Sequence, residues 1–222
     1  MTKPLVLTAT MLLTLAATRQ AAAQAGPPDQ PGVDVAVRVG YAVPFGDVDG
    51  DNGDSLSSTF SGAVPFVFEA GYRFDRHFTL GPYFQYALAQ VKDGAAALCG
   101  NGVDCSGSII RLGLEALYHL DLGSAFVPWF GLGVGYEWMT FDASSGGRTA
   151  SASAHGWEFA TLQLGGDIYV APQFAVGPFV SFSIARYDRG SLTTGNTTTT
   201  SDITNTAVHE WLQFGARFSF SL

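Results

Sequence analysis

The chain has 222 residues and a formal net charge of −8, and it combines few charged residues (14%) with many apolar (47%) and aromatic (13%) ones. A length of this order suits a single domain. The acidic balance argues against nucleic-acid binding, which needs clustered Lys and Arg to neutralise phosphates. A soluble surface usually carries about 25–35% charged residues. The composition therefore indicates that much of this surface faces something other than water.

The N-terminus has the features of a secretory signal peptide. Lys3 supplies a positive charge, the run from Leu5 to Ala17 is almost uninterrupted apolar sequence, and Ala23-Gln24-Ala25 has the small-x-small pattern that signal peptidases cut. The apolar run is too short for a membrane-spanning helix, which needs about 20 residues. We expect residues 1–25 to be removed and residues 26–222 to form the mature domain, with a cut at Ala23 as the alternative.

The rest of the chain has a hydrophobic period of two. Near the C-terminus, Phe214, Phe218 and Phe220 occupy one row, whereas Gln213 and Arg217 occupy the other. This alternation is typical of a strand with two different environments. About eight such strands are predicted, each long enough to supply the roughly 9–11 residues of a tilted spanning strand. They lie near residues 33–43, 63–74, 78–90, 108–120, 126–140, 156–170, 174–187 and 207–222.

The predicted connections alternate in length. Three are short, at residues 75–77, 121–125 and 171–173. Four are long and polar, at residues 44–62, 91–107, 141–155 and 188–206. Short turns at one end and long loops at the other are typical of outer-membrane barrels. The predicted fold is all-β: a closed antiparallel up-and-down transmembrane β-barrel of about eight strands, with short periplasmic turns and long extracellular loops.

The polar row decides which face of the barrel points outward. A soluble barrel of the lipocalin kind also alternates, but its apolar face is inside and its charged face is in water. Here the polar row lacks lysine and places a few charges of both signs among small residues, which suits a cramped interior. We therefore expect the apolar row to face lipid. The polar row comprises Arg38, Glu69, Arg73, Gln85, Arg111, Glu115, His119, Glu137, Gln163, Asp167, Gln213 and Arg217.

Eight of these residues are expected to form a network of charges across the lumen, because an unpaired charge in a dry interior is expensive. The network comprises Arg38, Glu69, Arg73, Arg111, Glu115, Glu137, Asp167 and Arg217. It either fixes the barrel as a plug of ion pairs or lines a narrow path for water or ions. Eight strands leave an interior just wide enough for side chains, so a porin-sized channel is not expected.

The signal peptide, the hairpin count, the loop asymmetry and the ending Phe218-Ser219-Phe220-Ser221-Leu222 resemble the small OmpA/OmpX-type outer-membrane barrels. Members of that family end in alternating aromatic residues that the barrel-assembly machinery recognises, and they usually close with Phe, where this chain has Leu222. The resemblance implies a bacterial outer-membrane protein in contact with membrane lipid and lipopolysaccharide, which meets that machinery during biogenesis. We expect a monomer, because a closed barrel leaves no strand edge unpaired.

The two cysteines, Cys99 and Cys105, lie in a glycine-rich segment. An exported chain meets an oxidising periplasm, so we expect a disulfide between them.

The first long loop carries four aspartates that resemble the start of a calcium-binding loop. Asp47, Asp49, Asp51 and Asp54 stand beside glycines, and carboxylate oxygens of this kind can wrap Ca²⁺. Ser58 stands where such a loop places its bidentate glutamate. The alternative is a solvated acidic loop tip, and no other cofactor is expected.

The histidines bear on whether the protein is an enzyme. A serine hydrolase needs a base within hydrogen-bond reach of its nucleophile. Neither a His-x-Ser pair nor a G-x-S-x-G motif occurs in the sequence. We therefore predict a non-enzymatic outer-membrane protein with an envelope-structural or surface-interaction role through its loops. The alternatives are a narrow channel for water, ions or a small hydrophobic solute, and a membrane-embedded lipid hydrolase with His155 or His209 as its base.

Overall fold

The computed structural model describes residues 28–48, 50, 55–92, 99 and 102–222. The predicted signal peptide lies outside the described residues and stays a prediction, as does the extent of the mature domain. Among the described residues, none belongs to a helix that is long and apolar enough to cross a membrane.

The described chain forms nine strands and one short helix. They are β1 (Gly32–Gly46), α2 (Leu56–Thr59), β2 (Phe60–Arg73), β3 (Phe78–Val91), β4 (Asp104–His119), β5 (Phe126–Ser145), β6 (Arg148–Ala171), β7 (Phe174–Thr194), β8 (Thr197–Asp202) and β9 (His209–Ser221). Each strand pairs antiparallel with its neighbours in the sheet, and the order of the strands is β6-β5-β4-β3-β2-β1-β9-β7-β8.

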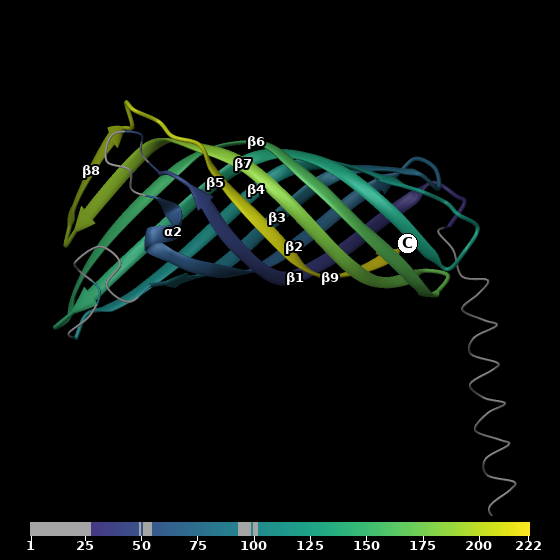
Figure 1. Ribbon diagram of the computed structural model, residues 1–222, viewed down its shortest axis with the longest axis horizontal. Helices are drawn as coiled ribbons and strands as arrows, with labels where there is room; N and C mark the ends of the chain where they lie inside the picture. The colour runs from purple at the N-terminus through teal and green to yellow at the C-terminus, as the bar shows by residue number, and fades with distance from the viewer. Residues whose placement is uncertain (1–27, 49, 51–54, 93–98, 100–101) are drawn as a thin grey trace, which may run out of the picture.

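A further pairing, of β6 with β7, closes eight of these strands into a ring. The ring gives the elongated barrel seen in Figure 1, where β8 lies beyond its left end. β8 pairs with β7 alone among the described strands and stays outside the ring. The predicted closed antiparallel barrel of about eight strands is confirmed.

Short turns join β2 to β3, β4 to β5 and β6 to β7, all at the right-hand end of Figure 1. Asp75 shapes the first of them by accepting hydrogen bonds from the amides of His77 (2.7 Å) and Phe78 (2.9 Å). These amides hold the pKa of the Asp75 carboxyl below its usual range. The three turns agree with the prediction from sequence.

Two of the long connections differ from the prediction. Residues 141–155 and 188–206 are largely β-hairpins rather than loops, because β5, β6 and β7 continue beyond the predicted strands and β8 is added. Gly146, Gly147 and Gly195 have φ values of 56°, 78° and 60°, which tight hairpin turns require. These hairpins carry few large apolar residues, among them Phe141 and Leu192, so their strands lack the strong alternation that identifies the others.

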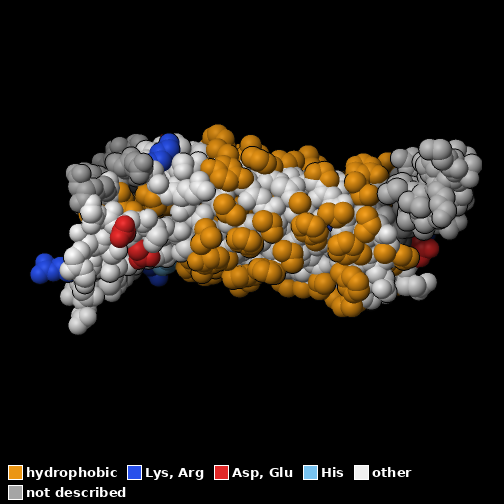
Figure 2. Space-filling view, turned by 90° about the horizontal axis from the view of Figure 1, so that it is seen from below, with side chains coloured by type: hydrophobic (Ala, Val, Ile, Leu, Met, Phe, Trp, Pro, Cys, Tyr) orange, Lys and Arg blue, Asp and Glu red, His pale blue; other side chains and the backbone are white. Residues whose placement is uncertain are grey.

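The outer face of the barrel is apolar. Figure 2 shows a band of hydrophobic side chains around the shaft on the face in view, whereas the end with the extended hairpins is mostly free of them. The band includes exposed Leu, Phe and Val residues from each of the eight barrel strands. A continuous apolar surface of this extent is tolerated by lipid and not by water.

Close backbone contact between β6 and β7 makes Gly177 sensitive to substitution. A Cβ at this position would lie 1.6 Å from the Gly166 carbonyl oxygen. We expect Gly177→Ala to lower the free energy of unfolding by about 1–3 kcal/mol, because the strands must shift apart. Gly190 on the same strand is the control, since its Cβ would meet nothing closer than 3.7 Å. Urea unfolding in lipid vesicles measures both variants, and equal stability of the two would contradict the expectation.

Candidate functional site

The polar row of the strands fills the barrel interior. All twelve polar residues assigned to this row from the sequence are buried. Alternate positions on the same strands carry the exposed apolar side chains described above. The barrel therefore has a polar interior and an apolar exterior, as the missing lysines predict.

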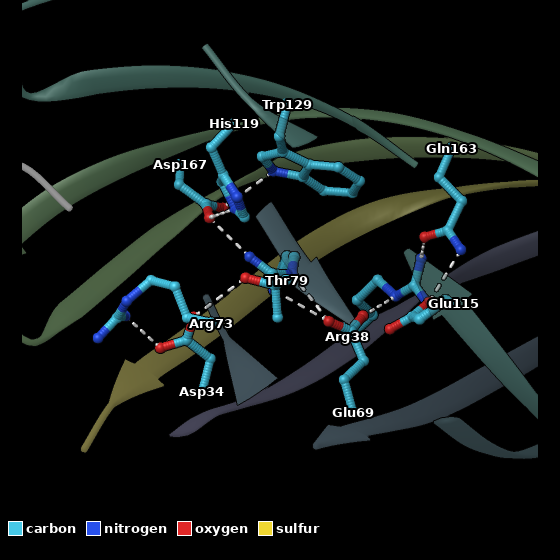
Figure 3. A network of polar contacts seen from close by, with 11 residues as sticks. Asp34, Arg38, Glu69, Arg73, Thr79, Glu115, His119, Trp129, Gln163 and Asp167 are labelled. Carbon is cyan, nitrogen blue, oxygen red and sulfur yellow. Dashed lines mark hydrogen bonds and ion pairs between the residues drawn. The ribbon is translucent and has the colours of Figure 1, made fainter. Parts of the chain in front are cut away.

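Five of the predicted lumen charges form one network in the half of the barrel nearer the short turns, here called the lower network. Arg38 makes ion pairs with Glu69 and, at 3.1 Å, with Glu115. Arg217 bonds to Glu69 at 3.0 Å and to Asp167 at 2.6 Å. Figure 3 shows Arg38, Glu69, Glu115 and Asp167 converging from different strands. Glu69 pairs with both arginines and thereby links the two halves of the network.

Neutral side chains complete the hydrogen bonding of the lower network. Gln163 donates to Glu115 at 2.9 Å and accepts from Arg38. The Trp129 indole donates to Asp167 at 3.2 Å, and the Arg217 guanidinium lies 5.1 Å from the centre of the same ring system. Buried charges are tolerated when they are paired and hydrogen-bonded, and the hydrogen bonds from Gln163 and Trp129 add to the ion pairs of this network.

Arg73, the sixth predicted lumen charge, lies apart from this network at the end of β2. It bonds to Asp34 at 2.5 Å and to the Ser221 hydroxyl at 2.9 Å (Figure 3 shows the pair with Asp34). Thr79 donates to the other oxygen of Asp34 at 3.4 Å. This group ties β1, β2, β3 and β9 together near the short turns.

The two remaining predicted charges, Arg111 and Glu137, lie in a second group nearer the extended hairpins, here called the upper network. Arg111 contacts Glu137 at 2.5 Å and Glu158 at 3.3 Å, and it donates to Ser183 at 3.0 Å. Tyr83 donates to Glu158 at 2.6 Å. Both glutamates are fully buried, so Arg111 is the cation that makes their burial tolerable.

His209 and Tyr187 complete the upper network. The His209 Nε2 lies 3.0 Å from a Glu137 oxygen, and Tyr187 donates to the same oxygen. The two rings stack with their centres 4.1 Å apart. Sequence reasoning missed Glu158 and Tyr187 as interior residues and considered His209 only as an external base.

The space between these side chains is small. One cavity of about 10 Å³ is lined by residues that include Glu69, Glu115 and Arg217. A second, also of about 10 Å³, lies between the networks and is lined by residues that include Arg38 and Arg111. Each has room for about one water molecule.

An apolar cluster fills the barrel beyond the upper network. Its buried members include Leu56 of α2, Phe60, Ile109 and Trp211. Ser55 begins the helix as its N-cap by accepting a hydrogen bond from the Ser58 amide at 3.1 Å. Leu56 is fully buried in this cluster, and α2 lies toward the barrel end that carries the extended hairpins (Figure 1).

The other predicted sites have separate outcomes. The disulfide joins Cys99 to Cys105. Asp49, Asp51 and Asp54 lie outside the described residues, so the calcium loop stays a prediction. Asp47 is described and forms an isolated bridge with Ser55. Within the described part of the chain, no His, Cys, Asp or Glu residues form a group that could hold a metal ion.

The hydrolase alternative is not supported by where the histidines lie. His209 is fully buried against Glu137, and the His155 ring lies 5.9 Å from that of Tyr136. Among the described residues, neither histidine has a hydrogen bond to a serine or threonine hydroxyl.

The comparisons with known proteins agree with this geometry. In sequence, the chain matches no curated protein. OprG from Pseudomonas aeruginosa shares the fold with a TM-score of 0.51 and 17% identity, covering 90% of this chain and 100% of that one. A major outer membrane protein from Thermus thermophilus gives a TM-score of 0.53 and 14% identity, covering 86% and 100%. At these identities the likeness shows the fold alone.

The family model described as outer membrane protein beta-barrel domain matches residues 7–218. The closed ring of eight strands, the apolar exterior and the charged interior are the features that this family needs in order to cross a bacterial outer membrane. The chain therefore belongs to the outer membrane protein beta-barrel domain family and is a bacterial outer-membrane protein of the small OmpA/OmpX-like type.

Proposed function

We propose that the protein is a non-enzymatic surface protein, whose barrel anchors a rigid, polar sheet for interaction with partners outside the cell. The observation that carries this proposal is the continuation of β5, β6 and β7 beyond the apolar band, joined by β8. The strands of both hairpins stay paired up to their turns, with Ser145 opposite Arg148 in the β5–β6 hairpin and Thr194 opposite Thr197 in the β7–β8 hairpin. A surface that is already hydrogen-bonded loses less conformational entropy on binding than a loop does.

The filled lumen supports an anchoring role over transport. The interior charges are paired, the cavities between them hold about one water each, and an apolar cluster follows them. A hydrated ion needs a continuous polar path. The barrel serves as an anchor in this proposal because its interior is occupied by its own side chains.

Shortening the β7–β8 hairpin tests the proposal. Arg189 and Asp202 are direct cross-strand neighbours, so residues 190–201 can be replaced by a two-residue Asn-Gly turn. Cells that carry this variant are expected to lose adhesion to mucin-coated plates and aggregation with one another, relative to wild type. The folding control is the heat-dependent shift in gel mobility, which we expect to remain. Unchanged adhesion and aggregation in the shortened variant would contradict the proposal.

A narrow path for water or protons is the second candidate, because the two cavities lie on either side of the Arg38 layer. Planar-bilayer recording separates the two functions. We expect no stable conductance steps from the wild-type barrel at neutral pH. Reproducible steps that disappear in Arg111→Met would favour the channel and contradict an anchoring role alone.

A further inference from the structure

A patch of six outward-facing side chains lies on β5, β6 and β7 where the apolar band ends. We call it the belt patch; it comprises Tyr136, Trp138, His155, Trp157, Phe159 and Arg186. Register places Tyr136 opposite Trp157, Trp138 opposite His155, and Trp157 opposite Arg186. Directly opposite residues share one face of a sheet. Glu158 and Tyr187, which alternate with the patch residues, are buried inside the barrel.

The rings of the belt patch contact one another. Tyr136 is central, with ring-centre distances of 4.7 Å to Trp138 and 5.2 Å to Trp157. The guanidinium of Arg186 lies 5.4 Å from the centre of the Phe159 ring, a cation–π contact. Arg186 thus lies against Phe159 and opposite Trp157, next to a cluster of partly exposed aromatic rings.

The position of Arg186 along β7 determines how deep its side chain lies in the membrane. Residues 174–184 of β7 supply the roughly 9–11 residues that cross the hydrocarbon layer. Ile184 is the last apolar residue of this outward row, and Arg186 is the next residue outward on the extracellular side. Tryptophan and tyrosine concentrate at the same level in membrane proteins. The guanidinium therefore lies among the head groups of the outer leaflet.

Arg186 has no anionic partner within the described part of the protein. None of the described carboxylates forms an ion pair with it. Its contact with the Phe159 ring is a cation–π contact, which leaves the N–H groups of its guanidinium available to a hydrogen-bond acceptor. Its neighbour Arg189 differs, because it pairs with Asp202 at 3.3 Å. A guanidinium offers planar, paired donors that match a phosphate. At the depth of the lipid head groups, the anionic group that pairs with the Arg186 guanidinium is the phosphate of a lipid.

We propose that the belt patch binds the phosphorylated sugar head group of an outer-leaflet glycolipid of the lipid A class. Arg186 bonds to a phosphate, and the Trp157 and Trp138 rings lie against the sugar. A bare phosphate would bond to the guanidinium but would make no contact with the tryptophan rings. An uncharged sugar would contact the rings but would form no ion pair with Arg186. The site lies on the membrane-facing surface, and its function does not depend on the extended hairpins.

Binding of diphosphorylated lipid A to the folded barrel in phosphatidylcholine nanodiscs tests the proposal, with native mass spectrometry counting bound lipids. Arg186→Gln is expected to bind about tenfold more weakly than wild type, which corresponds to one lost charge-assisted hydrogen bond of about 1.4 kcal/mol. Arg186→Lys is expected to lie between the two. Arg148→Gln is the matched control, because Arg148 is exposed at the tip of the β5–β6 hairpin, away from the patch.

Two further ligands separate the possible sources of phosphate. Dephosphorylated lipid A is expected to bind to wild type at least about tenfold more weakly than diphosphorylated lipid A does. Its affinity is expected to be the same for wild type and for Arg186→Gln. Inorganic phosphate at the same concentration is expected not to compete. The proposal is overturned by equal binding of both lipids, by equal weakening in Arg148→Gln, or by competition from inorganic phosphate. The heat-dependent mobility shift shows that each variant is folded.

Discussion

Arg217→Met is expected to lower the free energy of unfolding by about 3–5 kcal/mol, because it removes one partner from a buried ion network. Arg217 is only 3% exposed and is bonded to both Glu69 and Asp167. Methionine keeps much of the volume but leaves Asp167 without its arginine and Glu69 with one arginine instead of two. Urea unfolding in phospholipid vesicles, followed by tryptophan fluorescence, measures the loss.

Arg76→Met is the matched control. Arg76 also contacts two carboxylates, Asp29 and Asp121, but its side chain is 41% exposed at a turn. Exposed ion pairs contribute about 0–1 kcal/mol, so this variant should unfold almost as wild type does. Similar losses in the two variants would show that burial is not what makes the interior network important for stability.

Leu132→Arg is expected to destabilise the barrel by about 2–4 kcal/mol, because Leu132 lies where a charged side chain is most costly. Leu132 is 58% exposed on the outer face of β5, midway between the turn and the belt patch. In a membrane this position lies near the bilayer midplane. The same vesicle-based unfolding measurement reports the change.

Leu192→Arg is the control for this substitution. Leu192 is 55% exposed on β7, almost as exposed as Leu132, but it lies on the extension beyond the apolar band. Surface substitutions in water change stability by about 0.5 kcal/mol or less. A comparable loss at both positions would mean that the two leucines have the same surroundings, which contradicts a membrane-embedded band.

Alternation along the strands was enough to predict the closed barrel and its charged interior. Arg38, Glu115 and Arg217 lie on the predicted row and are buried. His209 also lies on the polar row of β9, two residues before Trp211, and could have been placed inside by extending the period of two. Its place near the long-loop end of the strand predicted for residues 207–222 favours an external site instead.

Glu158 could not be placed inside by alternation. Thr161, Gln163 and Asp167 face inward from odd positions of β6, so Glu158, at an even position, is expected outside. A register shift between Glu158 and Ala160 reverses the phase and turns this carboxylate toward Arg111. A bulge of this kind adds one residue to one strand. Its presence depends on pairing with β7, which the sequence of β6 alone does not contain.

The extended hairpins were missed for a different reason. The alternation rule detects a strand by the contrast between its two faces, and the Thr-rich segment of β8 has both faces in water. Only the turn glycines and the β-branched threonines indicate strands in that segment.

The seam between β1 and β9 joins the two ends of the described barrel, with Asp34 opposite Ser221 and Gly46 opposite His209. This pairing has the greatest sequence separation in the ring, and closing so long a segment of chain costs conformational entropy before any bond forms. Until the seam forms, β1 and β9 each have an edge whose backbone groups are unsatisfied in hydrocarbon. Insertion and closure must therefore be coupled in time, and an intermediate stalled before closure would be an exposed target for proteases and chaperones.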